Sequence, residues 1–113
     1  MFSKKVKWIR FFSSREELEQ AMGSRKSLPI NVNMKDLILL DNEGQYHLIK
    51  NKCPHQGLPM VNAKCQGEYV ICPYHQYKFS LNTGRGHGLY LDHYPIEFRE
   101  DGVYAGFEYF SIF

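Results

Sequence analysis

Two short segments of the chain carry pairs of side chains that can bind a metal. Cys53 and His55 lie in the tripeptide CPH, and Cys72 and His75 lie in the tetrapeptide CPYH. Each segment therefore offers one sulfur donor and one imidazole nitrogen donor. Residues 56–71 separate the two segments, which is enough chain for one small hairpin that brings both together at its tip. The spacing favours a single metal site with two sulfur and two nitrogen ligands.

The order of the donors narrows the choice of metal. In zinc sites with two cysteines and two histidines, the two cysteines usually come first and the two histidines follow. Here each cysteine is instead paired with a histidine. That arrangement fits an iron-sulfur cluster in which two histidines replace two cysteines on one iron. A zinc site and a vestigial loop that binds no metal are the alternatives.

Length and composition favour one folded domain. A chain of 113 residues is near the usual size of a single folding unit. With 43% hydrophobic and 15% aromatic residues, it has enough apolar side chains for a core and does not resemble a disordered segment. We therefore expect one domain over residues 1–113.

Charge and cysteine content exclude several classes of protein. The net charge of +2 is small and no basic stripe with interleaved aromatic residues is present, so we expect no nucleic-acid partner. No run approaches the roughly 18 apolar residues of a membrane span. Lys7 and Arg10 interrupt the apolar N-terminal stretch, so a secretory signal is not expected either. Three cysteines are too few for a secreted disulfide scaffold, which favours a cytoplasmic protein.

The first part of the chain predicts one strand and one helix. Residues 5–12 are rich in β-branched and aromatic side chains, which is typical of a strand. Ser14 and Glu17 have the spacing of a capping box, so a short helix is expected over residues 15–22. Gly23 is expected to end it.

The remainder of the chain predicts short strands joined by tight turns. A loop is expected at residues 24–27 and Pro29. Two hairpins are expected, with strands at 36–41 and 45–50 around a turn at 42–44, and with strands at 94–99 and 103–107 around a turn at 100–102. The metal-binding segments lie between these hairpins. The pattern indicates an all-β protein of antiparallel hairpins with one short helix.

The sequences around the four donors resemble a known family. CPHQGLPM at 53–60 and CPYHQYKFSLNTG at 72–84 resemble the cluster-binding signature of Rieske-type [2Fe-2S] proteins, and the order of strands resembles that of the small soluble Rieske ferredoxins. The resemblance implies a Rieske-like antiparallel β-sandwich with a small cluster-binding subdomain of two loops within residues 51–84. It also implies one [2Fe-2S] cluster, with Cys53 and Cys72 on one iron and His55 and His75 on the other.

The same resemblance implies a function. With two thiolates and two neutral imidazoles, the oxidised cluster is neutral and the reduced cluster carries one negative charge, so a single electron is the expected cargo. We expect an electron-transfer protein, not an enzyme, that passes electrons from a reductase to a terminal oxygenase or another redox enzyme. A monomer is favoured. The alternative is a non-catalytic subunit or sensor, similar to the Rieske-fold small subunits of nitrite reductases, although those are expected to lack the four ligands.

The family comparison also predicts a low reduction potential. Leu58 and Tyr74 stand where the high-potential branch has a disulfide, and Tyr77 and Phe79 stand where that branch places hydroxyl donors to the cluster. Fewer hydrogen bonds to sulfur leave the reduced state less stabilised. We expect a potential near about −150 mV, the low end of the Rieske range.

The cysteine and histidines outside the two metal-binding segments could have a chemical role, but we expect a structural one for them. Cys65 is expected to be a buried or half-buried thiol, and residues 108–113 are expected to pack in the core or at an edge. The segment 86–89 lacks the proline that many relatives have near the cluster. Basic side chains close in sequence to the loops predict a basic rim that attracts an acidic partner: Lys50, Lys52, Lys64, Lys78 and Arg85, against Glu68 alone. His47, His87 and His93 are expected to be structural.

Overall fold

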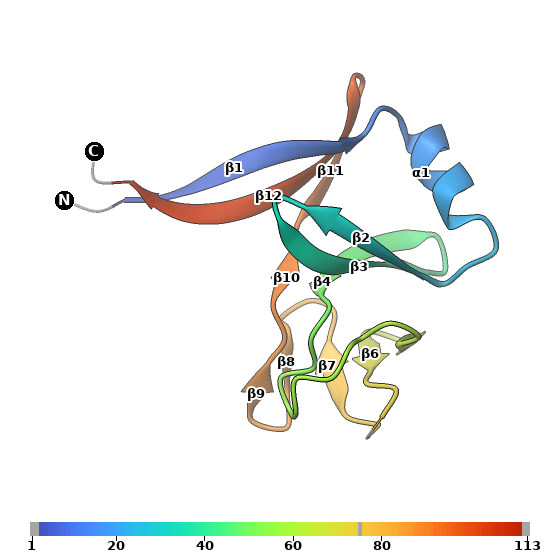
Figure 1. Cartoon of the computed structure of the whole chain (residues 1–113), viewed down its shortest axis with the longest axis vertical. Helices are drawn as coiled ribbons and strands as arrows, with labels where there is room; N and C mark the ends of the chain where they lie inside the picture. Colours follow the sequence, from blue (N-terminus) through green and yellow to red (C-terminus); the bar gives the residue numbers. More distant parts are fainter. Residues whose placement is uncertain (1–2, 75, 112–113) are drawn as a thin grey trace.

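The computed structural model describes residues 3–74 and 76–111, which form short antiparallel strands and one helix (Figure 1). The expected all-β class with a single short helix is confirmed for these residues. In chain order the elements are β1 (Ser3–Phe12), α1 (Arg15–Met22), β2 (Ser27–Val32), β3 (Lys35–Asn42), β4 (Gln45–Lys50), β5 (Lys64–Gln66), β6 (Tyr69–Ile71), β7 (Lys78–Ser80), β8 (Arg85–Gly86), β9 (Leu89–Tyr90), β10 (His93–Tyr94), β11 (Ile96–Arg99) and β12 (Gly102–Ser111). No helix in this part of the chain is long and apolar enough to cross a membrane.

Two larger sheets form the main part of the molecule, called the base below, which is the upper part in Figure 1. One has the strand order β1-β12-β11 and the other has the order β10-β4-β3-β2. Helix α1 packs at the end of the first sheet (Figure 1). The first apolar core combines side chains of the helix and of both sheets: Leu18, Met22, Val32, Leu37, Leu39, Leu48, Val103, Ala105 and Phe107.

A smaller subdomain covers the opposite face of the four-stranded sheet. It consists of the sheet β5-β6-β7 and the hairpin β8-β9, and it carries both metal-binding loops (Figure 1). The second apolar core joins it to the sheet and consists of Ile38, Leu40, Ile49, Cys53, Met60, Ala63, Val70, Cys72, Phe79, Leu81 and Leu91. The expected antiparallel sandwich with a separate small subdomain is therefore present.

Strand β3 is buried on both faces because it separates the two cores. Leu37 and Leu39 point into the first core, while Ile38 and Leu40 point into the second. Successive side chains of a strand point to opposite faces, so an uninterrupted apolar run fits only a strand that is covered on both sides. The run LILL thus fixes the position of β3 between the base and the metal-binding subdomain.

The expected helix is confirmed at its stated bounds, with a modified cap. Ser14 Oγ accepts a hydrogen bond of 3.1 Å from the backbone N–H of Glu17. The Glu17 carboxylate accepts from the backbone N–H and the hydroxyl of Ser13, at 3.1 and 2.7 Å, and not from Ser14 as in a standard capping box. Gly23 ends the helix with φ of 54° and donates its N–H to the carbonyl of Glu19 at 2.9 Å.

Two expectations that involve prolines are wrong. Pro29 lies inside β2, because β2 is an edge strand and an edge tolerates a residue without an N–H. The single strand expected at 94–99 is divided at Pro95. Tyr94 pairs with β4 in one sheet and Ile96 pairs with β12 in the other, so Pro95 lies where the chain changes sheets. Its carbonyl accepts a hydrogen bond from Gly106 at 3.0 Å, which ties the two sheets together.

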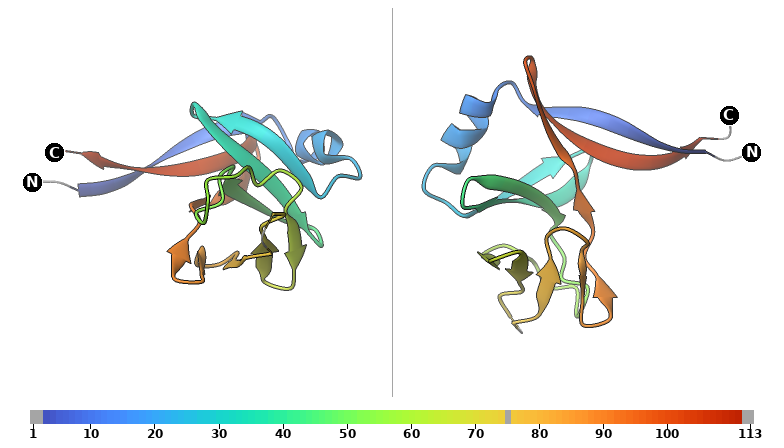
Figure 2. Two further views of the ribbon diagram at one scale, coloured as in Figure 1. Left: turned by 60° about the horizontal axis from the view of Figure 1, so that its bottom comes forward. Right: turned by 180° about the vertical axis from the view of Figure 1, so that it is seen from behind.

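The C-terminal aromatic segment lies in a two-stranded ribbon. Strands β1 and β12 pair from Ser3 with Ser111 inward, and the ribbon that they form projects beyond the body of the molecule (Figures 1 and 2). Tyr109 is half exposed and Phe110 is 75% exposed. Of the two expectations for this segment, core packing is therefore wrong for these two side chains; residues 112–113 lie outside the described residues.

Gly86→Ala tests the close packing of β8 against β7. A Cβ at residue 86 would collide with the carbonyl oxygen of Lys78 and would lie 3.2 Å from the Cα of Phe79. The two strands must then separate, and we expect a loss of about 2 kcal/mol, which lowers Tm by roughly 8 °C. Melting followed by circular dichroism measures this change.

Gly88→Ala is the matched control for that substitution. Nothing lies within 4 Å of its Cβ position, but its φ is 74°, so only the left-handed backbone is penalised. We expect about 1 kcal/mol and a correspondingly smaller fall in Tm. Equal Tm values for Gly86→Ala and the unaltered protein would contradict the packing described here.

Candidate metal centre

The first metal-binding loop is a tight turn closed by two backbone hydrogen bonds. Gly57 donates its N–H to the carbonyl of Cys53 at 2.7 Å, and Cys53 donates its own N–H to the carbonyl of Leu58 at 2.7 Å. Gly57 has φ of 73°, a conformation that glycine adopts without steric penalty. Cys53 is the first residue of this turn, and His55 lies within it.

The second loop repeats this pattern with the same separations in sequence, four residues for one hydrogen bond and five for the other. Gln76 donates to the carbonyl of Cys72 at 3.0 Å, and Cys72 donates to the carbonyl of Tyr77 at 2.8 Å. Gln76 has φ of 58°, so it takes the left-handed conformation that Gly57 takes in the first loop. The two cysteines therefore begin turns of the same hydrogen-bonded form, and the matching loops hold both thiols at equivalent places.

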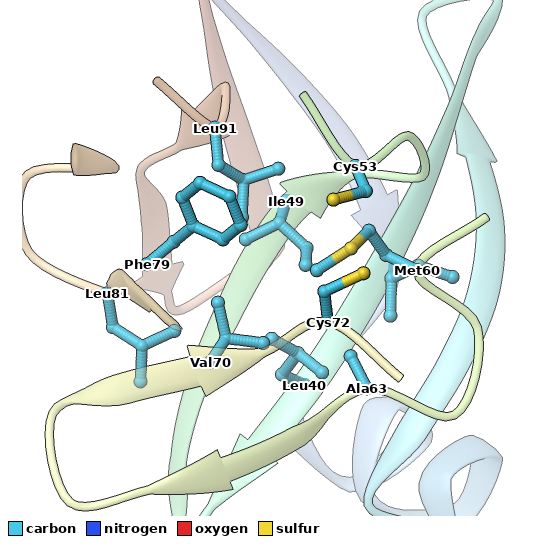
Figure 3. Close-up of a cluster of buried hydrophobic side chains, with 11 residues drawn as sticks. Leu40, Ile49, Cys53, Met60, Ala63, Val70, Cys72, Phe79, Leu81 and Leu91 are labelled. Atoms are coloured by element: carbon cyan, nitrogen blue, oxygen red, sulfur yellow. The ribbon is translucent and has the colours of Figure 1, made fainter. Parts of the chain in front are cut away.

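The two thiols are buried side by side. Cys53 is 1% exposed and Cys72 is 0% exposed, and both belong to the second apolar core. Figure 3 shows their sulfur atoms among Ile49, Met60 and other apolar side chains. Burial is the main cause that raises the pKa of the Cys53 thiol, and its hydrogen bond with the Cys72 side chain raises that pKa further.

This pair of thiols fits an iron-sulfur cluster. An apolar pocket disfavours thiolates, and two thiolates next to each other repel, so both can ionise only beside a positively charged group. A metal centre provides that charge and deprotonates a coordinating thiol. The oxidised core of a [2Fe-2S] cluster carries two positive charges, which two thiolates neutralise. The chemistry of these donors therefore fits the expected group.

His55 approaches the same region from the first loop. Its Nδ1 is buried, and its ring packs on Tyr77 with 4.1 Å between ring centroids. His75, the fourth expected ligand, lies outside the described residues. Among residues 3–74 and 76–111, no group of three or more His, Cys, Asp or Glu side chains is close enough to hold a metal ion. The described part thus brings the two cysteines into contact, and the complete ligand set stays a prediction.

The sequence analysis expected a structural role for His87, and the structure places this residue beside the second loop. His87 lies at the turn between β8 and β9, and its ring stacks on Tyr77 with 4.5 Å between centroids. Gly86 and Gly88 flank this residue, but no local sequence pattern gives its position beside the second loop. The place where many relatives have a proline-containing segment is occupied here by this hairpin.

The expected basic rim is less uniform than the sequence suggested. Lys50 forms an ion pair with Asp92 at 3.7 Å, and Asp92 was not counted because it is distant in sequence from the loops. Lys52 is exposed, and its side chain lies next to Gly57. Lys50, Lys52 and Asp92 line one hollow together with Cys53 and Tyr90. The surface beside the first loop therefore carries both signs of charge.

Comparison with known proteins identifies the family. The Rieske [2Fe-2S] domain family matches residues 12–90. The ferredoxin component of the naphthalene 1,2-dioxygenase system of Pseudomonas putida is 31% identical over 80 residues, which are 71% of this chain and 72% of that protein. Human apoptosis-inducing factor 3 is 35% identical over 48 residues, which are 42% of this chain. This chain spans only 8% of the length of that protein.

A solved structure shares the fold. A chain in the complex of reduced oxygenase and oxidized ferredoxin in carbazole 1,9a-dioxygenase is 21% identical, with a TM-score of 0.60 over 71% of this chain and 87% of that chain. The protein belongs to the Rieske [2Fe-2S] domain family. Its cofactor is accordingly a Rieske-type [2Fe-2S] cluster, which confirms the resemblance inferred from the two cysteine-histidine segments.

The reactivity of Cys65 tests the separation of this thiol from the metal centre. Cys65 is half-buried on β5, and burial, followed by the nearby Asp41 carboxylate, raises the pKa of its thiol. A raised pKa leaves less of the reactive thiolate than in free cysteine at about pH 8. We expect iodoacetamide to modify Cys65 several-fold more slowly than free cysteine, with a rate that rises above about pH 9.

Mass spectrometry of the cluster-loaded protein measures the alkylation and locates it. We expect one modified cysteine, Cys65, and modification of Cys53 and Cys72 only after the cluster is removed and the chain unfolded. Labelling of Cys53 or Cys72 in the loaded protein at the rate of Cys65 would contradict the proposed site.

Proposed function

We propose that this protein is a one-electron carrier that passes electrons from a reductase to a terminal oxygenase or another redox enzyme. Cys53 and Cys72 hold one iron of the [2Fe-2S] cluster, and His55 and His75 hold the other. The observation that carries this proposal is the contact of two buried thiols at the bases of two matching turns. The named roles of the dioxygenase and alkene monooxygenase ferredoxin components support it.

The ligand set suits electron transfer better than catalysis. When bound, the cluster accepts one electron at a site that goes from neutral to singly negative. Cys53 and Cys72 are enclosed by the apolar core, which keeps water away from the sulfur side. His55 is half-buried whereas both cysteines are buried, so the imidazole side is the more accessible one for a partner. No position is left open for a substrate, and we propose an electron-transfer protein, not an enzyme.

The setting of this carrier is part of the proposal. We propose a single domain over residues 1–113, because one sheet supplies side chains to both cores. A reductase as donor, an oxygenase or other redox enzyme as acceptor, a monomeric state and a cytoplasmic location are proposed with it. Neither nucleic acid nor membrane is proposed as a partner. A subunit like the small subunits of nitrite reductases is the second candidate, and the presence of all four ligand residues disfavours it.

Substitution of single ligands tests the assignment. Cys53→Ser, Cys72→Ser, His55→Ala and His75→Ala should each reduce bound iron from about two per chain to well below one, because outer contacts cannot replace a lost ligand. Cys65→Ser is the matched control and should keep the full iron content, since this thiol is not a ligand. Iron and sulfide analysis of anaerobically purified protein gives the result. Full iron content in Cys53→Ser or Cys72→Ser would refute the assignment.

The reduction potential tests the class of carrier. Phe79 is fully buried and has no hydroxyl to donate, and all three cysteines are free, so the core offers neither a phenolic donor at residue 79 nor a disulfide brace. We expect a midpoint near about −150 mV by redox titration of the visible spectrum. A midpoint above about +100 mV would place the protein with the high-potential carriers and contradict this account.

A further inference from the structure

Three aromatic rings form a row that begins at His55. The rings of His55 and Tyr77 have centroids 4.1 Å apart and planes inclined by 36°. The His87 ring also packs on Tyr77, with 4.5 Å between centroids and planes inclined by 29°, in a stacked arrangement. The three rings come from the first loop, the end of the second loop and the β8–β9 turn. The β8–β9 turn is thus linked to His55, a proposed ligand, by the Tyr77 ring that lies between them.

The His87 ring, at the outer end of this row, is held by a hydrogen bond from the backbone of β7. Nε2 of His87 accepts a hydrogen bond from the backbone N–H of Lys78 at 3.1 Å, which fixes the ring orientation and places the proton of the neutral ring on Nδ1. This contact requires the turn to lie directly against β7. Gly86 permits the approach, because any side chain there would collide with the carbonyl of Lys78.

The backbone at His87 supports a specific role for the side chain. Its φ is 54°, in the left-handed region that side-chain-bearing residues rarely adopt. Gly adopts this region without steric cost and Asn visits it routinely, so the left-handed backbone does not itself require a histidine. Unfavourable conformations are retained where the surrounding structure uses them. The turn alone therefore does not account for an imidazole at this position.

We propose that His87 is a positioning residue that, through Tyr77, sets the orientation of the His55 ring at the cluster. The χ2 angle of a histidine takes a broad range of values unless neighbouring groups restrict it. Groups that contact a metal ligand fix its orientation and thereby tune the properties of the metal. Tyr77 can restrict His55 only if it is itself held, and the stacked His87 ring is one of the contacts that hold it. The inference rests on the proposed role of His55 as a ligand.

Two substitutions separate the ring from the turn. His87→Asn tolerates the left-handed backbone, but it removes the ring that stacks on Tyr77 together with the Nε2 acceptor for the Lys78 N–H. Tyr77→Leu removes the middle ring and leaves the backbone bond between Tyr77 and Cys72 in place. His47→Gln is the matched control, because it removes a half-buried imidazole on β4 that lies outside this row.

The readouts are made on the cluster-loaded protein. Pulsed electron paramagnetic resonance reports the couplings of the ligand nitrogens, a redox titration gives the midpoint potential, and bleaching in the presence of an iron chelator gives the rate of cluster loss. For His87→Asn and Tyr77→Leu we expect altered couplings for one of two histidines, a shifted midpoint and about tenfold faster cluster loss. His47→Gln should match the unaltered protein in all three.

The outcomes distinguish this inference from the proposed function. Unchanged couplings, midpoint and bleaching rate in both variants, or a lower Tm with unchanged couplings, would overturn the positioning role while leaving the carrier intact. If one variant fails to fold, the other decides the matter by the same criteria. Absence of histidine couplings in the unaltered protein would overturn both the ligand assignment and this inference.

Discussion

The structure is organised around two thiols that must ionise inside an apolar core. Cys53 and Cys72 lie side by side with almost no exposed surface, and this burial raises the pKa of the Cys53 thiol. When bound, a [2Fe-2S] core would favour the thiolate form, because its two positive charges balance the charges of two thiolates in a site from which water is excluded. Burial that disfavours a thiolate in the absence of a cation would therefore favour binding of a cationic cluster, and the proposed imidazole ligands would leave the whole site close to neutral.

The fold supplies the rigidity that this arrangement needs. Strand β3 is covered on both faces, so the metal-binding subdomain and the base of the molecule pack against the same strand. Each loop is closed by the same two backbone hydrogen bonds around a left-handed residue, Gly57 in one and Gln76 in the other. Asn42 adds a bond of 2.8 Å from the β3–β4 turn to the carbonyl of Gly67, which links the base to the β5–β6 turn. The ligand-bearing loops therefore rest on paired strands.

Local patterns in the sequence predicted those features that depend on neighbouring residues. The helix was placed at its observed bounds from Ser14, Glu17 and Gly23, and the turn before β4 was found from its glycine. The errors have a common origin in contacts between distant segments. Pro29 is acceptable in β2 only because that strand lies at an edge, and the change of sheet at Pro95 depends on β4 and β12. The position of His87 beside Tyr77 likewise arises from the packing of β8 on β7, which no local pattern contains.

The most direct test of this account is the electron paramagnetic resonance spectrum of the dithionite-reduced protein, purified without oxygen, with iron, sulfide and zinc measured on the same sample. The account predicts a rhombic signal with a low average g value, about two irons and two sulfides per chain, and no zinc. A protein that gives no signal and contains zinc or no metal would retain the fold but contradict the role of electron carrier.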